Sequence, residues 1–281
     1  MSTLTPRGPF SLAASVRFLE GFTPASYADA GDGVLRLAFP ADDGYPAVGA
    51  AVRQDGDTVR AEFTGPDATA QVARILSLDV DGAGFPAVGD ADPVVAGLMA
   101  EFPGLRPVCF YSPYEAAAWA VIGHRVRMTQ AAAVKSRLAE RYGERVEVAG
   151  RVLHAFPAPP VLRTLPPRVL GLTDVKVERL HAIADAAEDG ALDAARLRAL
   201  PADDALAELR GLPGIGPFSA ELILIRGAGH PDVFPRHEPR LHAAMARAYG
   251  GDAGDVPRLA GIAERWRPYR SWVALLLRAG G

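Results

Sequence analysis

The stretch Leu209–Ala220 reads LRGLPGIGPFSA and joins two helical patterns through a very short glycine-rich turn. Gly214 and Gly216 permit positive φ and let a ligand approach the backbone closely. Pro217 begins the second helix, where its missing N–H costs nothing. Because the free amides of the turn and of this helix start face outward, they predict an anion site suited to a nucleic-acid phosphate, contacted without reading sequence. The alternative is an ordinary helix–helix turn with a glycine cap.

The chain is helical almost throughout on both sides of this turn, from residue 93 onward. Apolar residues recur there at helical spacing, and Gly and Pro separate the segments. The expected helices cover residues 93–102, 113–123, 128–142, 175–188, 203–210, 217–227, 237–249, 255–265 and 270–278. Since local helical contacts dominate, an all-α domain is the natural expectation.

The first 88 residues show a different pattern. A helical segment at 11–22 precedes three strand-like runs with turn signals between them, as in a β-meander. The runs are Val34–Pro40, Pro46–Gln54 and Thr58–Thr64. A helix opens at Pro66, and the Gly-, Asp- and Pro-rich stretch Asp79–Asp92 is expected to be a linker. The sequence thus predicts an α+β chain, with a small N-terminal antiparallel α/β domain (1–88) before a large all-α helix–hairpin–helix domain (89–281).

Composition narrows the class of protein. With 281 residues, 49% of them hydrophobic and 22% charged, the chain can bury a full core. It has neither an apolar run of about 18 residues nor a signal-peptide pattern, so we expect a cytoplasmic, nucleoid-associated monomer and no membrane partner. The single cysteine, Cys109, excludes an internal disulfide and a cysteine-based zinc or iron–sulfur site.

Charge is unevenly distributed along the chain. Residues 1–102 carry six arginines, no lysine and 14 acidic residues, whereas the remainder carries 24 basic and 19 acidic residues. This segregation favours a polyanionic partner for the later part of the chain, although solvated charged faces would give the same count. Lys135 and Lys176 are the only lysines among the 30 basic residues.

Ordered motifs along nearly the whole chain resemble the DNA-3-methyladenine glycosylase II branch of the helix–hairpin–helix base-excision glycosylases. Besides the hairpin they are Pro9-Phe10, Tyr114–Gly123, Leu138–Val146, Leu170–Ala187, Arg226-Gly227, Asp232–Phe234 and Glu264–Ser271. The resemblance implies two helical subdomains flanking a DNA cleft, and double-stranded DNA containing damaged bases as the partner. It also implies hydrolysis of the N-glycosidic bond of an alkylated base that has been flipped out of the duplex.

The family's catalytic carboxylate is an Asp in a Phe-x-x-x-Asp context, where it stabilises the positive charge that develops on the sugar. The matching run here is Phe234-Pro235-Arg236-His237-Glu238, so the resemblance assigns the catalytic role to Glu238, whose carboxylate is one methylene further from the backbone. Three functions stay open: a glycosylase for alkylated purines of the 3-methyladenine type, a DNA- or damage-binding protein with weak or no hydrolysis, and a glycosylase for a different lesion.

The resemblance assigns further residues by position. The expected DNA contacts are Gly214, Gly216, Phe218, Ser219, His124 and Arg125, the last filling the space that the flipped base leaves. The expected base pocket is Phe218, Leu222 and Arg278, where Phe218 stands for a frequent Trp and Arg278 replaces a stacking aromatic residue. Phe218 also occupies the position of the Schiff-base lysine of bifunctional relatives, so a monofunctional enzyme is expected. No cofactor is expected for the chemistry, and the main-chain carbonyls of Arg210, Leu212 and Ile215 would hold a structural Na⁺ or K⁺.

Overall fold

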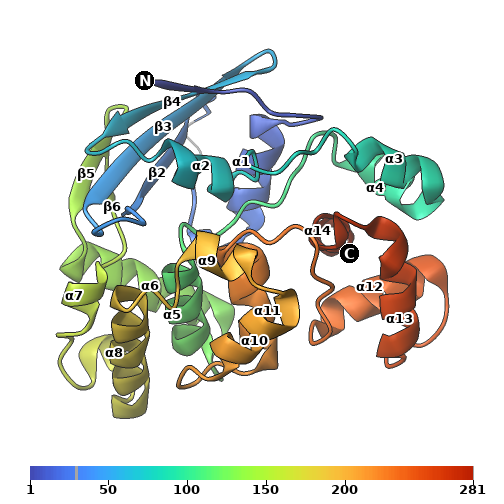
Figure 1. Ribbon diagram of the computed structural model, residues 1–281. Coiled ribbons are helices and arrows are strands. Elements are labelled where there is room, and N and C mark those ends of the chain that lie inside the picture. Colours follow the sequence, from blue (N-terminus) through green and yellow to red (C-terminus); the bar gives the residue numbers. More distant parts are fainter. Residues whose placement is uncertain (29–30, 281) are drawn as a thin grey trace.

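The computed structural model describes residues 1–28 and 31–280 and shows a sheet beside two groups of helices (Figure 1). In chain order the elements are β1 (Ser2–Leu4), α1 (Leu12–Gly21), η1 (Thr23–Ala25), β2 (Leu35–Pro40), β3 (Ala47–Asp55), β4 (Thr58–Thr64), α2 (Thr69–Ile75), α3 (Phe85–Ala91), α4 (Pro93–Glu101), α5 (Pro113–Gly123), α6 (Met128–Tyr142), β5 (Arg145–Val148), β6 (Arg151–His154), α7 (Pro159–Leu162), η2 (Val169–Gly171), α8 (Asp174–Glu188), α9 (Ala194–Ala199), α10 (Ala202–Arg210), α11 (Pro217–Leu222), η3 (Ile223–Gly227), α12 (Pro239–Tyr249), α13 (Val256–Ala263), η4 (Glu264–Trp266) and α14 (Arg270–Ala279). The η segments are short 3₁₀ turns, except η3, which is π-helical.

The N-terminal sheet is antiparallel, with strand order β1-β4-β3-β2, and it confirms the expected α+β class. Successive side chains of β3 face opposite ways, as the period of two requires. Val48, Ala50 and Val52 face the core shared with α1 and α2, and Ala51 faces the opposite side. β1 was not expected, because its three residues are too few to show an alternation.

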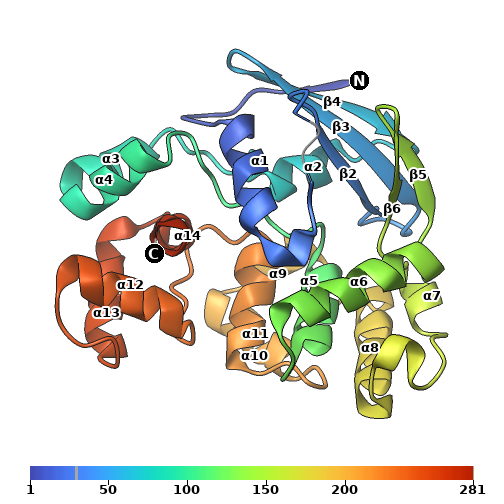
Figure 2. The same ribbon diagram turned by 180° about the vertical axis from the view of Figure 1, so that it is seen from behind.

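A second hairpin, β5–β6, covers that opposite face of the sheet (Figure 2). Val146 and Val148 pack with Ala51, and they come so close to Gly49 that a Cβ there would lie 2.6 Å from Val148 Cγ2. The expectation that residues 89–281 are all-α is therefore wrong at this point, although the remainder is mostly helical. These four-residue strands are stabilised by the sheet that they cover, so their sequence carries little signal on its own.

The first helical group surrounds α5, which is buried on nearly all sides and packs against α6, α8, α11 and η3. Such an all-round apolar helix forms the centre of a larger core. The observed bounds of α5 and α6 match the predicted helices 113–123 and 128–142.

The second helical group combines α12, α13 and α14 with α3 and α4, which come from much earlier in the chain (Figure 1). Phe85 and Val88 of α3 are buried against Tyr269 and Trp272. Asp79–Asp92 is therefore not simply a linker: α3 lies inside it, and the expected domain boundary at residue 88 falls within this helix. Small residues, Pro and Gly in FPAVGDA concealed the helix.

Two buried arginines fix the N-terminal domain to the first helical group. Arg74 of α2 donates from Nη1 to the Gly227 carbonyl (2.7 Å) and pairs through Nη2 with Asp42 (2.6 Å). Arg226 donates from Nε to the Val108 carbonyl (3.1 Å), and its guanidinium lies 4.6 Å from the centre of the Phe22 ring. Because both contacts end on η3, the helix that follows the glycine-rich turn is held from the domain side. Within the described residues, no helix is both long enough and apolar enough to cross a membrane.

Candidate nucleic-acid interface and active site

The glycine-rich turn lies between α10 and α11, as expected, and its two key glycines differ. Gly214 has φ +87°, and a Cβ there would lie 2.6 Å from Arg179 Cδ, so both its backbone and its surroundings require glycine. Gly216 has φ −91° and ψ −179°, so the expectation that it needs a positive φ is wrong. No atom lies within 4 Å of a Cβ placed at Gly216, which leaves its outer side open to a ligand.

The helix after the turn exposes some residues and anchors others. Phe218 is 45% exposed, whereas Ser219 and Leu222 are half-buried. The helix widens into the π-helical η3, in which Gly227 lies so close to α5 that a Cβ would be 2.8 Å from Pro113 Cα. A π-helical turn inside a helix is uncommon and frequently marks a functional site.

Glu238, the expected catalytic residue, is the N-cap of α12. The predicted helix 237–249 begins two residues later than expected, because the Glu238 backbone is not helical (φ −107°, ψ 89°). Its Oε1 accepts a hydrogen bond from the Arg240 amide (3.2 Å). The same oxygen lies 3.8 Å from Nε of Arg278, in the last turn of α14, so the structure brings together two expected site residues that are forty positions apart.

The buried Glu221, which sequence reasoning missed, ties α11 to the turn that carries Glu238. Its side chain is 6% exposed and accepts from the Arg236 amide (3.0 Å), the His237 amide (3.0 Å) and His237 Nδ1 (2.7 Å). A carboxylate that accepts several hydrogen bonds from one segment fixes that segment firmly. The available signal was an acidic residue within the apolar run FSAELILI, since a buried charge needs partners.

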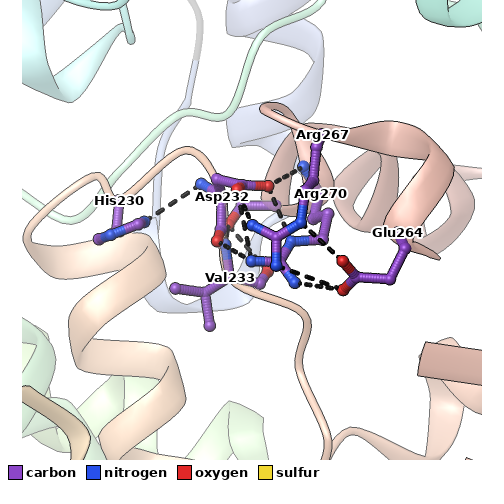
Figure 3. Close-up of polar contacts among 7 residues, drawn as sticks. His230, Asp232, Val233, Glu264, Arg267 and Arg270 are labelled. Atoms are coloured by element: carbon purple, nitrogen blue, oxygen red, sulfur yellow. Dashed lines mark hydrogen bonds and ion pairs between the residues drawn. The ribbon is translucent and has the colours of Figure 1, made fainter. Parts of the chain in front are cut away.

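A second anchor holds the same segment a few residues earlier, as Figure 3 shows. Asp232 accepts from Arg270 Nε (2.8 Å) and from Arg267 Nη1 (2.7 Å), and both arginines also contact Glu264. The hydrogen bond from Arg267 holds the pKa of the Glu264 carboxyl below its ordinary value. The chain from residue 232 to Glu238 is thus fixed at one end by the start of α14 and at the other by α11.

His230 closes this network from the other side. Its Nδ1 accepts a hydrogen bond from the Asp232 amide (3.1 Å), so this nitrogen carries no proton (Figure 3). Burial lowers the pKa of the His230 ring below its ordinary value. The neutral ring therefore contributes to the position of Asp232.

His124 and Arg125 lie exposed on the loop between α5 and α6, where Arg125 has φ +56°. They line a hollow of about 470 Å³ together with Lys176 and Arg179 of α8 and apolar side chains. None of its lining residues is acidic, and Arg179 also contacts the glycine-rich turn at Gly214. The hollow thus joins the Arg125 loop to the turn as one basic surface. In the described part of the chain no hydrogen bond or ion pair joins His124 or Arg125 to Glu238.

The expected cation ligands, the carbonyls of Arg210, Leu212 and Ile215, belong to one short segment at the end of α10 and in the turn. The Leu212 carbonyl accepts the Ile215 amide hydrogen bond (3.1 Å), which leaves its second lone pair for another partner. The Na⁺ or K⁺ stays a prediction. No cluster of three or more His, Cys, Asp or Glu side chains suited to a metal ion occurs among residues 1–28 and 31–280.

Comparison with known proteins identifies relatives of this chain. It is 30% identical over 212 residues to the probable bifunctional transcriptional activator/DNA repair enzyme AlkA of Mycobacterium tuberculosis, a match covering 73% of this chain and 41% of that protein. It is 32% identical over 183 residues to DNA-3-methyladenine glycosylase 2 of Escherichia coli, covering 63% of this chain and 61% of the relative. The chain therefore spans about 40% to 60% of the length of these curated relatives. No family model matches the chain.

The fold has solved counterparts as well. The 3-methyladenine DNA glycosylase of Archaeoglobus fulgidus superposes with a TM-score of 0.80 at 21% identity, covering 99% of this chain and 97% of that one. A structure of MBOgg1 in complex with a low-affinity DNA ligand superposes with a TM-score of 0.75 at 17% identity, covering 99% and 96%. The resemblance seen in the sequence motifs is confirmed: the chain is a relative of the DNA-3-methyladenine glycosylases and has the fold of the helix–hairpin–helix DNA glycosylases.

Proposed function

We propose that this protein is a monofunctional DNA glycosylase that hydrolyses the N-glycosidic bond of alkylated purines of the 3-methyladenine type, in base-excision repair of double-stranded DNA. One observation carries the proposal: through Glu221, the helix of the glycine-rich turn holds the segment that presents Glu238. A carboxylate for the chemistry and backbone amides for a phosphate thus belong to one continuous support. The names of the relatives in M. tuberculosis and E. coli agree with this function.

The proposed reaction begins with a damaged nucleotide flipped out of the duplex, because the bond cannot be reached inside the stack. The bond between C1′ and the base nitrogen breaks, and both of its electrons stay with the base. Glu238 stabilises the positive charge that forms on the sugar and orients a water molecule. The water oxygen bonds to C1′ and loses a proton, leaving a free base and an abasic sugar.

Binding relies on charge and on backbone amides. We propose that the amides of residues 214–219 hold one phosphate of the duplex, with Gly216 leaving room for its approach. Arg125 enters the duplex where the base has left, with His124 beside it on the loop, and an arginine plane can stack on bases there. The flipped base lies against Phe218, Leu222 and Arg278.

The chemistry stops at base release, because no lysine is placed to form a Schiff base. Lys135 of α6 pairs with the buried Glu115 (2.5 Å), and Lys176 donates to the Ile122 carbonyl (2.7 Å). Position 218, on the helix of the glycine-rich turn, holds phenylalanine. The expected products are therefore a free base and an intact abasic strand.

A second function, damage binding with weak or no hydrolysis, is favoured by one observation. Oε1 of Glu238 already accepts the Arg240 amide and faces Arg278, so its charge is partly engaged before DNA binds. A carboxylate held about 1 Å from its best position can cost on the order of 10²-fold in rate. Both functions share the same DNA surface and differ in turnover.

Incubation with methylated duplex DNA, followed by chromatography of the released bases, separates the two functions. The glycosylase releases methylated purines and leaves strands that alkali cleaves at abasic sites, without a covalent complex trapped by borohydride. Tight binding to the same duplex without release would favour the damage-binding function. Efficient borohydride trapping would show that the monofunctional assignment is wrong.

A further inference from the structure

Arg278 offers an unsatisfied positive charge beside the proposed catalytic carboxylate. Its Nε lies 3.8 Å from Oε1 of Glu238, and the two side chains are 31% and 22% exposed. Within the described residues, no protein acceptor takes a hydrogen bond from its guanidinium, which carries five N–H donors. The donors are therefore available to a ligand that lies against Glu238.

We infer that Arg278 makes this site favour modified purines that are uncharged over N-methylated purines that carry a positive charge. The inference rests on the proposed function, since it needs C1′ of the substrate to lie beside Glu238. The base is bonded directly to C1′. It therefore comes within reach of a guanidinium that is only 3.8 Å from the same carboxylate.

An uncharged base matches both halves of this ion pair. When its bond to C1′ breaks, both electrons stay with the base, so a cationic sugar and an anionic base form together. Glu238 faces the sugar, and Arg278 donates hydrogen bonds to a ring nitrogen or exocyclic oxygen of the base as negative charge develops there. Water then adds to C1′, and the proton that it loses restores a neutral base.

A cationic base gains nothing from Arg278. It carries its positive charge on entering the site, where a guanidinium repels it, since like charges at short range disfavour binding. On leaving it becomes neutral, so no negative charge develops for the N–H donors to stabilise. Arg278 thus lowers the efficiency toward cationic lesions and raises it toward uncharged ones.

The test compares Arg278→Gln with the wild type on two duplexes. One carries 1,N6-ethenoadenine, which is uncharged, and the other 7-methylguanine, which is cationic. The single-turnover rate ratio of uncharged to cationic lesion is expected to fall about tenfold in Arg278→Gln, because one partly screened charge interaction changes sign of effect between the two substrates. Arg278→Lys keeps the charge and should largely keep the ratio. Arg247→Gln, at an exposed position of α12, serves as the matched control and should not change it.

The outcomes separate the inference from the proposed function. Release of both lesions at a ratio that Arg278→Gln leaves unchanged overturns the inference and leaves the glycosylase intact. If the wild type releases neither base, the proposed function fails, and the charge preference is read from binding to duplexes whose lesions carry hydrolysis-resistant 2′-fluoro sugars. Tighter binding of the uncharged lesion that Arg278→Gln abolishes then supports the inference, and equal affinities overturn it.

Discussion

Replacing Glu238 with glutamine removes the charge proposed to stabilise the sugar cation while keeping the size of the side chain. The glutamine carbonyl can still accept the Arg240 amide hydrogen bond that caps α12. The ion pair with Arg278 at 3.8 Å is partly exposed, so its loss costs only about 0.2–1 kcal/mol of stability. The folded structure should therefore survive the substitution nearly unchanged.

The chemical step should lose far more. Removal of one preorganised electrostatic contact to a developing charge slows a reaction roughly 10²–10³-fold, which corresponds to about 2.7–4 kcal/mol. This loss exceeds the expected loss of stability several times over, so the two effects can be separated. DNA affinity should hold or rise slightly, because a negative charge near the phosphates has gone.

The assay measures single-turnover base release from a methylated duplex with the protein in excess, alongside the midpoint of thermal unfolding. Asp255→Asn is the matched control, since Asp255 caps α13 through the Arg258 amide (3.1 Å) in the same way. It should alter stability to a similar degree and leave base release unchanged. Equal rates for Glu238→Gln and the wild type would remove Glu238 from the mechanism.

Glu238→Asp tests whether the site has adapted to the longer acid. The shorter side chain draws the carboxylate back from its position beside Arg278. If the backbone suits glutamate, the rate falls on the order of 10²-fold, the cost of a displacement of about 1 Å. A faster reaction than that of the wild type would show that the natural carboxylate is out of position and would favour the damage-binding function.

Three further changes probe the supports of the site. Gly216→Asp occupies open space with an allowed backbone, so it should weaken duplex binding and its salt dependence without unfolding the protein, whereas Gly261→Asp on exposed α13 should do neither; equal titration curves for the two variants would contradict the phosphate site. Glu221→Gln should lower the free energy of unfolding by about 1.5–3 kcal/mol and slow base release on the order of 10²-fold with little change in duplex affinity; an unchanged rate would show that it does not position Glu238. Because burial lowers the pKa of His230, the unfolded chain binds a proton that the folded ring does not, so the free energy of unfolding should fall as the pH drops below about 6.5; His230→Gln should flatten this dependence in urea titrations, and an equally steep curve would place its origin elsewhere.

Elements with strong local signals were predictable from the sequence. The turn and helix starts around Pro217 follow from Gly and Pro positions, and the strand Thr58–Thr64 matches its predicted bounds. Helices α5 and α6 match as well, because their periodicity extends over several turns. Short strands and the helix inside the expected linker were missed, since they are stabilised by the surfaces on which they pack.

By itself the sequence determined the glycine-rich turn, the strands and long helices, and Glu238 as the candidate carboxylate, because each of these depends on neighbours a few residues away. Only the tertiary structure decided what surrounds that carboxylate. Arg278 reaches it from the end of α14, Glu221 holds its turn from α11, and Asp232 is anchored by arginines near the C-terminus. Such contacts join segments separated by many residues. They are fixed by how whole helices pack around a shared core, and no local pattern specifies that packing.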